Sequence, residues 1–475
     1  MTLRKAMALA MMTSALVAPG AAMAKARHAA GGDGGLTIAE QLRDAQHQIA
    51  QLQAQLIELT NRVNAQQASL PAPAQAQLAQ AQSDAAAASA KADTAIAAAK
   101  VADAKASKPV VPDVLKGLAN TSISGRMYFN ASHVTHEVNG IKTGNTDNGG
   151  GFAIKRFYLG VDHKFDDVWS ASLTMDADNP VATTSGGIAG RGFFIKKAYL
   201  QAKVRPELVV RLGSADLPWV PYVEGLYGYR HIEKVLVDRT GFGTSADWGV
   251  HAMGDLAGGV ISYQVSAVDG GGFRDVHFGK TIDLEGRISA RYKGFNVAVG
   301  GYTGKLGKNL VVAAGAPNAL RTYNRFDALA AYQGKIGPDM PFTVGFEYLY
   351  AKNKAFNTTA PIAQSASEDA AEGYSGFASL GFAKHYSVFG KYETSKPSKD
   401  LHPTFKEDYF NVGLQWSPAK IVDLALVYKR DQAVNGAYSV GSLQSGVIGC
   451  SASAAIVCAG KGTYDEFGLF GQFRF

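Results

Sequence analysis

From about residue 121 to the end of the chain, apolar and polar residues alternate with a period of two. Successive side chains of an extended strand point to opposite faces, so each alternating segment predicts a strand with one apolar and one polar face. The last segment, Tyr464–Phe475, has Phe467 and Leu469 on one face and Glu466 and Gln472 on the other. A soluble β-sandwich and a barrel that crosses a membrane both produce this alternation.

The connections between the strands separate these two folds. We count sixteen alternating segments, and those with even numbers are followed by tight turns such as Phe165-Asp166-Asp167 and Arg205-Pro206-Glu207. Segments with odd numbers are followed by longer stretches rich in Gly, Asn, Asp, Ser and Ala. Short turns at one rim and long loops at the other are typical of transmembrane barrels. We therefore predict an all-β fold, a transmembrane antiparallel β-barrel of about sixteen strands, over residues 120–475.

Composition agrees with a barrel. The 475 residues include 53 Gly, 20 Tyr and 23 Phe, and 18% are charged. The mean hydropathy of −0.05 is too polar for a bundle of membrane helices, whereas a barrel conceals its apolar half in the alternation. The net charge of +7 is spread without a dense Lys/Arg patch, so no nucleic-acid partner is expected.

Residues 1–24 have the pattern of a secretory signal peptide. Arg4 and Lys5 form the charged start, Ala6–Ala18 the apolar run, and Ala22-Met23-Ala24 the small-residue cleavage site. After this segment no run of about 18 apolar residues remains, so no helix is expected to span a membrane. An exported chain with barrel strands predicts the outer membrane of a Gram-negative cell, with the N-terminal region in the periplasm.

Residues 25–70 contain a heptad repeat that predicts a periplasmic coiled coil. One such helix exposes an apolar stripe, which implies a partner, although a helix that packs on its own barrel remains an alternative. The mixed Leu, Ile and Val positions do not choose between a dimer and a trimer. Residues 71–119 are rich in Ala and Pro and predict a semi-rigid spacer. The heptad positions are Ile38, Leu42, Ala45, Ile49, Leu52, Leu56, Leu59 and Val63.

The two cysteines, Cys450 and Cys458, are close in sequence, which in an exported chain favours a disulfide. A metal site is not expected, because no His/Asp/Glu cluster at ligand spacing accompanies them. Enzyme signatures are equally poor. Gly279-Lys280-Thr281 resembles the end of a phosphate-binding loop, but Arg274 stands where its first Gly is needed. We expect neither an enzyme nor a cofactor.

Three stretches resemble the phosphate-selective porin O and P family: Phe152–Asp176, Lys196–Trp219 and Glu233–Arg239. Their shared features are a basic pair before an aromatic strand, the AYL strand, and a Gly-terminated strand that leads into a Pro-containing loop. The resemblance covers roughly residues 120–475. It implies a trimeric sixteen-stranded channel in which lumenal Arg and Lys attract anions such as phosphate. Many relatives of this family carry an N-terminal coiled coil.

The third long connection, Ala215–Gly243, is a candidate for the constriction of such a channel. In sixteen-stranded porins the third loop folds into the barrel and narrows it. We expect the Trp and Tyr residues of this connection to anchor it to the inner wall, while Arg230, Lys234 and Arg239 face the pore water. An external loop that packs on its neighbours is the alternative.

Alternation also assigns charged residues to the inner wall. In a narrow pore a cluster of one sign sets the potential that ions meet. The cations concentrate between Arg126 and Arg211, which favours anions, although the many acids of the wall leave open that these charges are paired or merely solvated. The pore-lining candidates on the strands are Arg126, Arg156, Lys197, Lys203, Arg205 and Arg211. The acids assigned to the same wall include Asp176, Glu285, Glu347, Glu393 and Glu466.

Taken together, the sequence predicts an outer-membrane porin that allows passive diffusion of small hydrophilic solutes and prefers anions such as phosphate. Its expected partners are outer-membrane lipid, two further copies in a homotrimer, and peptidoglycan through the coiled coil. The alternative is a structural barrel that tethers the envelope, with the coiled coil bound to peptidoglycan or to another partner.

Overall fold

The computed structural model describes residues 50–58, 61, 72–106, 118–142, 148–178, 193–276, 278–279, 281–308, 322–354, 368–439, 447–450 and 458–475. The chain divides into two compact units, Met1–Val111 and Pro112–Phe475. The predicted signal peptide, residues 1–24, and most of the predicted coiled coil, residues 25–70, lie outside the described residues.

The N-terminal unit is helical where it is described. Helix α4 (Ala72–Ala106) occupies 35 residues of the segment predicted as a spacer, because Ala has the highest helix propensity. Residues 50–58 are also helical, and the Gln53 side chain donates a hydrogen bond to Asp93 of α4 at 3.2 Å. Leu52 and Leu56 of the heptad repeat are exposed. The described helices include none with the length and apolar character needed to cross a membrane.

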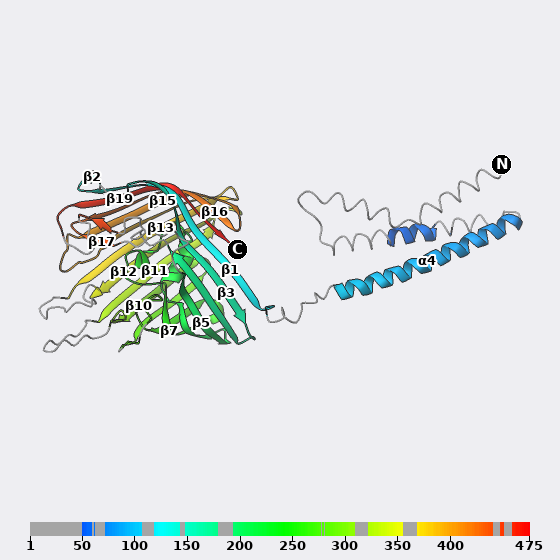
Figure 1. The fold of residues 1–475 in the computed structure, drawn as a ribbon, viewed down its shortest axis with the longest axis horizontal. Coiled ribbons are helices and arrows are strands. Elements are labelled where there is room, and N and C mark those ends of the chain that lie inside the picture. The colour runs from blue at the N-terminus through cyan, green and yellow to red at the C-terminus, as the bar shows by residue number, and fades with distance from the viewer. Residues whose placement is uncertain are drawn as a thin grey trace. The chain divides into compact units, whose positions relative to one another are not determined.

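The second unit is a closed antiparallel β-barrel of sixteen long strands, which confirms the predicted fold class (Figure 1). A short strand, β2 (Ile141–Lys142), extends the sheet beside β1, and β17 (Ala437–Ser439) pairs with β18 (Val447–Gly449) in a separate hairpin. The sixteen strands are β1 (Thr121–Val138), β3 (Gly149–Lys164), β4 (Trp169–Asp178), β5 (Phe194–Arg205), β6 (Leu208–Asp216), β7 (Ala246–Leu256), β8 (Ile261–Val268), β9 (Asp283–Tyr292), β10 (Phe295–Gly304), β11 (Tyr323–Lys335), β12 (Pro341–Lys352), β13 (Ala370–Phe382), β14 (Tyr386–Lys396), β15 (Lys406–Ala419), β16 (Val422–Val434) and β19 (Lys461–Arg474).

The last strand closes the barrel against the first. Strands β1 and β19 pair antiparallel, with Arg126 opposite Arg474 at one end and Val138 opposite Gly462 at the other. The terminal Phe475 continues this pairing, because Gly125 and Phe475 exchange backbone hydrogen bonds of 3.1 and 3.0 Å. The Phe475 ring covers Gly125 so closely that a Cβ at this position would lie 2.2 Å from it. Closure leaves the sheet no free edge.

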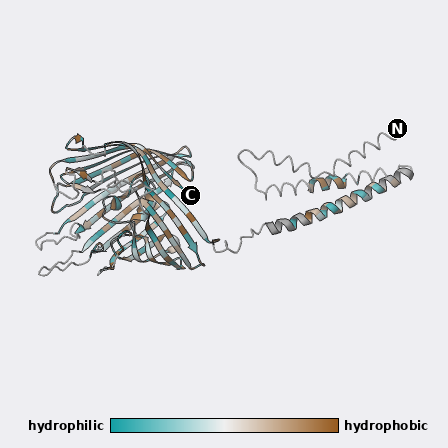
Figure 2. Cartoon of the chain, viewed as in Figure 1, coloured by the Kyte–Doolittle hydropathy of each residue, from teal (hydrophilic) through white to brown (hydrophobic). Residues whose placement is uncertain are grey.

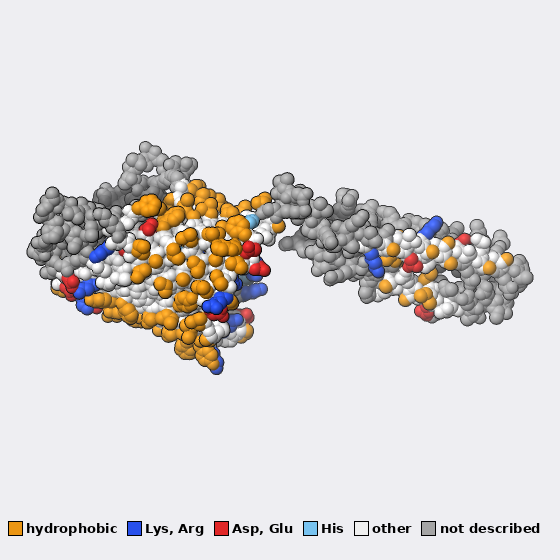
Figure 3. Space-filling view, turned by 90° about the horizontal axis from the view of Figure 1, so that it is seen from below, with side chains coloured by type: hydrophobic (Ala, Val, Ile, Leu, Met, Phe, Trp, Pro, Cys, Tyr) orange, Lys and Arg blue, Asp and Glu red, His pale blue; other side chains and the backbone are white. Residues whose placement is uncertain are grey.

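The two faces of the strands differ as the alternation predicts. On β19, Phe467 and Leu469 point outward and are 53% and 42% exposed, whereas Glu466 and Gln472 point inward and are buried. Hydrophobic and hydrophilic residues alternate along the strands in the same way (Figure 2). Hydrophobic side chains spread over the outer face in Figure 3, with charged side chains mainly at its edges. Barrels that meet lipid have such an outer band.

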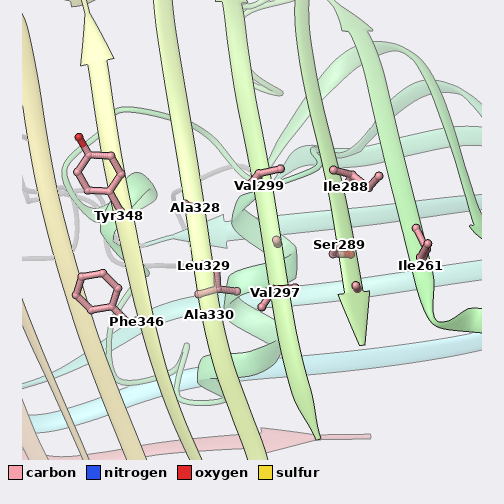
Figure 4. A pocket seen from close by; sticks show the side chains of 12 residues that line it. Ile261, Ile288, Ser289, Val297, Val299, Ala328, Leu329, Ala330, Phe346 and Tyr348 are labelled. Atoms are coloured by element: carbon pink, nitrogen blue, oxygen red, sulfur yellow. The ribbon is translucent and has the colours of Figure 1, made fainter. Parts of the chain in front are cut away.

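A shallow apolar hollow lies on this outer face, over strands β8 to β12 (Figure 4). It has a volume of about 420 Å³ and forms where the small Ala328 and Ala330 stand between larger neighbours such as Ile288, Val297 and Phe346. No charged side chain lines this hollow.

Among the described residues, the larger hydrophobic core of the interior lies on one side of the barrel. The connection between β6 and β7 folds into the barrel and forms two short helices, α6 (Val220–Tyr227) and α7 (Leu236–Arg239). Most of its apolar residues, among them the fully buried Trp219 and Leu236, pack against inward residues of β10 to β14, β16 and β19. The alternative of an external loop is therefore excluded. We call this connection, residues 217–245, the inner loop.

Cys450 and Cys458 are joined by a disulfide. The nearby hairpin β17–β18 also turns into the barrel, and Ile448 of β18 is buried in a small apolar cluster with Val134, Phe405 and Tyr464. The segment after β16 is therefore held against the barrel by this packing, while the disulfide closes a short loop within the segment.

Candidate functional site

The inner loop leaves an open cavity between itself and the opposite wall. The cavity has a volume of about 860 Å³ and lies against strands β1, β3 to β6 and β19. Among the side chains that line it, six are cationic and two are acidic, so the lining is basic. These are Arg126, Lys196, Lys197, Arg230, Lys420 and Arg474, with Asp216 and Glu224.

Two β-bulges increase the number of cations that point inward. Between β1 and β3 the register shifts so that Tyr128 pairs with Arg156 and Phe129 with Ile154, which leaves Lys155 as the extra residue. A bulge inserts one residue into the alternation, so both members of a sequential pair reach the same side. Lys155 accordingly bonds the inner loop, while Arg156 bonds Asp176.

The second bulge repeats this arrangement on β5. Thr174 pairs with Lys197 and Met175 with Ile195, so Lys196 is the extra residue, and both lysines line the cavity. Strict alternation would have sent one lysine toward lipid, which costs several kcal/mol at the midplane. Alternation did not predict that Lys155 and Lys196 point inward. The signal that could have indicated it is that each is followed directly by a second basic residue, Arg156 and Lys197.

The cations of the wall differ in how far they are neutralised. Lys197 forms an ion pair with Asp216 at 3.1 Å. In the described part of the barrel, Arg126 and Lys196 have no carboxylate within ion-pair distance. Arg126 instead lies 3.4 Å from the Tyr128 hydroxyl, and the Lys196 ammonium lies 5.0 Å from the centre of the Tyr158 ring. Both therefore keep positive charge available to a solute.

Arg126 also faces another cation across the closing seam. It stands directly opposite Arg474, whose guanidinium donates to Asp423 at 2.8 Å and to the Lys420 carbonyl at 2.9 Å. Opposed like charges on neighbouring strands destabilise one another. Asp423 neutralises Arg474, so Arg126 is the member of the pair whose charge an anion in the cavity would meet.

On the loop side of the cavity, Arg230 is paired within the loop itself. Its guanidinium lies 2.5 Å from Glu224 and 3.8 Å from Asp238. Burial opposes its charged form, but these carboxylates, chiefly Glu224, outweigh burial and raise the pKa of Arg230. Burial by itself would raise the pKa of Asp238. The nearby cations, Lys234 more than Arg230, outweigh burial and lower this pKa, so Asp238 stays ionised. The loop tip is thus nearly neutral in charge.

His231 follows Arg230 and lies between the cavity and the wall. It is buried, and its ring lies 6.2 Å from those of Tyr128 and Tyr229. Burial lowers the pKa of His231 to about 3, so the imidazole is neutral at physiological pH. It therefore adds no charge to the constriction.

The opposite half of the inner wall is acidic and covered by the inner loop. Six inward carboxylates, each on a different strand between β9 and β16, are at most 2% exposed. They are Glu285, Asp327, Glu347, Glu393, Glu407 and Asp431. We call this half the covered wall, and the half formed by β1, β3 to β6 and β19 the open wall.

Arg239 corrects one prediction from the sequence. It does not face the pore water, because it is 1% exposed and lies beneath the inner loop. It forms ion pairs with Glu393 and Glu407, and with Asp431 at 2.9 Å, while Tyr409 lies 4.4 Å from its guanidinium. Arg239 is therefore the anchor of α7 on the covered wall.

Trp219 anchors the start of the inner loop in a similar way. Its indole N–H donates to Glu347 at 2.8 Å, and its backbone N–H donates to Glu285 at 3.2 Å. Arg325 joins Glu285 and Asp327 at 3.0 and 2.8 Å. The carboxylates of β9, β11 and β12 are therefore bonded to protein groups and not to solutes in the pore.

The remaining predicted site residues are not part of the cavity lining. Lys234 pairs with Asp238 at 3.0 Å, and Arg211 donates to Gln201 at 2.8 Å. Lys203 and Arg205 are exposed near the tight turn after β5, away from the cavity lining. The structure thus brings Arg126, Lys197 and Arg230 together in one cavity. A role in selecting solutes remains a prediction for all of them.

No family model matches this chain, and no curated protein matches it in sequence. Among solved structures, it is similar to an anion-selective porin from Comamonas acidovorans, with a TM-score of 0.51 and 11% identity over 75% of this chain and 99% of that one. Weaker similarities include OmpT of Vibrio cholerae, with a TM-score of 0.47, 10% identity and coverage of 75% and 97%. The outer-membrane channel DcaP of Acinetobacter baumannii has a TM-score of 0.45 and 12% identity, with coverage of 75% of this chain and 97% of that one. The barrel of this chain therefore has a porin fold.

Proposed function

We propose that this chain is an outer-membrane channel through which small hydrophilic solutes diffuse passively, with anions preferred. One observation carries the preference. The cavity beside the inner loop is lined by six cations and two carboxylates, whereas the six inward carboxylates of the covered wall are buried beneath that loop. Solutes in the passage therefore meet the cations of the open wall and few of the acids.

The physical mechanism is electrostatic. Low-dielectric walls focus the field of lumenal charges, which raises the local concentration of counter-ions. Conduction also requires that each binding site release its ion readily. Arg126 and Lys196 offer charge without a carboxylate partner in the described barrel, while the pairing of Lys197 and Arg230 moderates their attraction. This combination suits passage better than tight binding.

The resemblance to the phosphate-selective porin family makes phosphate a natural solute to test, and the fold shared with an anion-selective porin agrees with anion preference. By the same resemblance, we assign the chain to a homotrimer in the outer membrane. The tight-turn rim would then face the periplasm, where residues 25–70 would form the coiled coil.

Planar-bilayer recording tests the proposed selectivity. The full chain, purified in detergent, is inserted into a bilayer under a tenfold KCl gradient, and the reversal potential is measured. We expect a reversal potential whose sign shows that chloride passes more readily than potassium. Replacing chloride by phosphate should retain the sign if phosphate also passes. A reversal potential of cation sign would overturn the anion preference, and absence of channel events from folded protein would overturn the channel.

Exposure of Leu52 and Leu56 on a helix keeps a second function open, that of an envelope tether. Deletion of residues 38–63 separates the two functions. A channel should still conduct after this deletion, whereas a tether should lose its attachment to isolated peptidoglycan. Loss of peptidoglycan binding with unchanged conductance would indicate that one chain has both roles.

A further inference from the structure

The tip of the inner loop is held by two lysines that share one acceptor. The ammonium groups of Lys155 on β3 and Lys429 on β16 each donate a hydrogen bond of 2.8 Å to the backbone carbonyl of Ile232. A carbonyl oxygen has two lone pairs, so it can accept both bonds. The two lysines come from strands on either side of the closing pair β1 and β19. Their shared bond therefore joins the loop tip to the seam of the barrel.

Three neighbours make it possible to hold two ammonium groups this close. Lys429 lies 3.5 Å from both Glu233 and Glu466. The buried Phe470 ring lies under both ammonium groups, with its centre 4.4 Å from that of Lys429 and 5.2 Å from that of Lys155. The carboxylates offset the repulsion of the two cations, and the ring face adds cation–π attraction.

The second carboxylate is itself fixed by β1. Glu466 accepts hydrogen bonds from Asn130 at 2.8 Å and from Ser132 at 2.7 Å. Lys155 reaches this place only because the bulge on β3 turns it inward. The arrangement thus needs contributions from four strands and is built at one point of the inner wall.

Ile232 is two residues from Arg230 and one from His231, both of which border the cavity. We infer that Lys155 and Lys429 are positioning residues that hold the loop tip in place, and so set the width and the anion preference of the passage although neither lines it. The anion part of this inference rests on the proposed function; the width part does not. Release of the tip would widen the passage and uncover part of the covered wall.

Because both lysines use one acceptor, their effects should not add. After Lys155→Met the carbonyl keeps the bond from Lys429, so the tip should stay near its place. The double variant K155M/K429M removes both bonds and should release it. Contacting residues that share a partner show this coupling, whereas independent contributions to stability would add.

The experiment measures the flux of uncharged sugars of increasing size into liposomes that contain the full chain. Sugar flux reports the width of the passage and is insensitive to the lost charges. We expect K155M to remain within about twofold of wild type. The double variant should admit a larger sugar, at a flux well above the product of the effects of K155M and K429M measured separately. Reversal potentials of the same variants should shift toward cations. Lys396→Met, which removes an exposed lysine at the end of β14, is the matched control.

Loss of Lys429 leaves the buried carboxylates Glu233 and Glu466 without their cation. A charge-balanced variant, K155M/K429M/E233Q/E466Q, which removes two cations and two carboxylate charges, is therefore measured in parallel. Folding is checked by the shift in gel mobility on heating. An unchanged sugar cut-off in a folded double or charge-balanced variant would overturn the inference. If the effects of the two lysine substitutions on sugar flux are purely additive, the two lysines do not act through their shared acceptor. A wild-type channel without anion preference would overturn the proposed selectivity, while the sugar measurement would still decide whether the lysines set the width.

Discussion

The open wall and the covered wall of this barrel are built from the same kind of strand and differ in what faces them. On the open wall, Arg126 and Lys196 border a cavity and have no carboxylate partner in the described barrel. On the covered wall, Glu347 and Glu393 are buried under the inner loop and bonded to it. The difference between them is access to water, which the inner loop decides.

This difference shows why total charge is a poor guide to the preference of such a barrel. The chain has 47 basic and 40 acidic residues, a modest excess. A solute, however, responds only to charges whose field reaches the passage, and those near the inner loop are mostly basic. Burying an acidic side chain under the inner loop therefore favours anions in the passage, just as an added basic side chain would.

The largest expected effect comes from Arg239→Met. This change leaves Glu393, Glu407 and Asp431 buried without their cation, and breaking such a network costs about 3–5 kcal/mol. We expect a lower free energy of unfolding in denaturant, a larger single-channel conductance and a weaker anion preference. If the preference survives in a folded variant with a displaced loop, burial under the inner loop is not what keeps the acids of the covered wall from the solute.

The matched control for this variant is Arg239→Lys. Lysine keeps the charge but presents one ammonium group, which cannot bond three carboxylates in the fork geometry of arginine. Stability and conductance should therefore fall between those of wild type and Arg239→Met. Equal behaviour of the Lys and Met variants would mean that geometry, and not charge, holds α7.

The next largest effect is expected from Arg230→Ala. Its removal leaves Glu224 and Asp238 partly unopposed beside the cavity, so the potential there becomes more negative. Charges near a water-filled passage interact by about 1 kcal/mol at 4 Å, which corresponds to roughly fivefold in the anion-to-cation permeability ratio. Reversal potentials check this. An unchanged ratio would show that the loop tip does not border the passage.

A pH-dependent effect of similar size is expected at His231, on the boundary between the two walls. Its pKa is about 3 when folded and about 6.5 when unfolded. The unfolded chain therefore binds more protons below pH 6.5, and the cost to the fold grows as pH falls toward 3. At pH 5.5 this cost is about 1.4 kcal/mol.

The variant His231→Phe removes this contribution, because phenylalanine does not titrate. The loss of unfolding free energy between pH 7.5 and pH 5.5 should accordingly be smaller in the variant by about the same 1.4 kcal/mol. Denaturant unfolding at the two pH values measures it. Identical losses in both proteins would mean that protonating the imidazole costs the fold nothing, and hence that His231 reaches water.

The smallest effect is expected from Lys196→Met on the open wall. One unpaired cation is lost from a cavity that keeps several others, so the permeability ratio should fall by about twofold at low salt. The change should shrink in 1 M KCl, where the Debye length is about 3 Å. Lys396→Met serves as the control. A loss that does not depend on salt would indicate a steric role for Lys196.

Much of the fold was predictable because it depends on local pattern. Alternation gives the strands and their outward faces, as Phe467 and Leu469 illustrate, and the sorting of turns and loops gives closure. The inner loop was predictable from its place in the chain and its aromatic residues, of which Trp219 is an anchor. The bulges at Lys155 and Lys196 were not, because a bulge depends on the register of two strands that alternation within one strand does not contain.

The sequence by itself therefore determined a barrel with a polar inner face, and a surplus of bases near its first strands. Only the tertiary structure decided which inward charges reach water. Arg230 and Arg239 belong to one loop and are nine positions apart, yet the first borders the cavity and the second lies bonded to three carboxylates. Burial depends on contacts between strands distant in sequence, and in a barrel these contacts exist only after the sheet has closed around its loop.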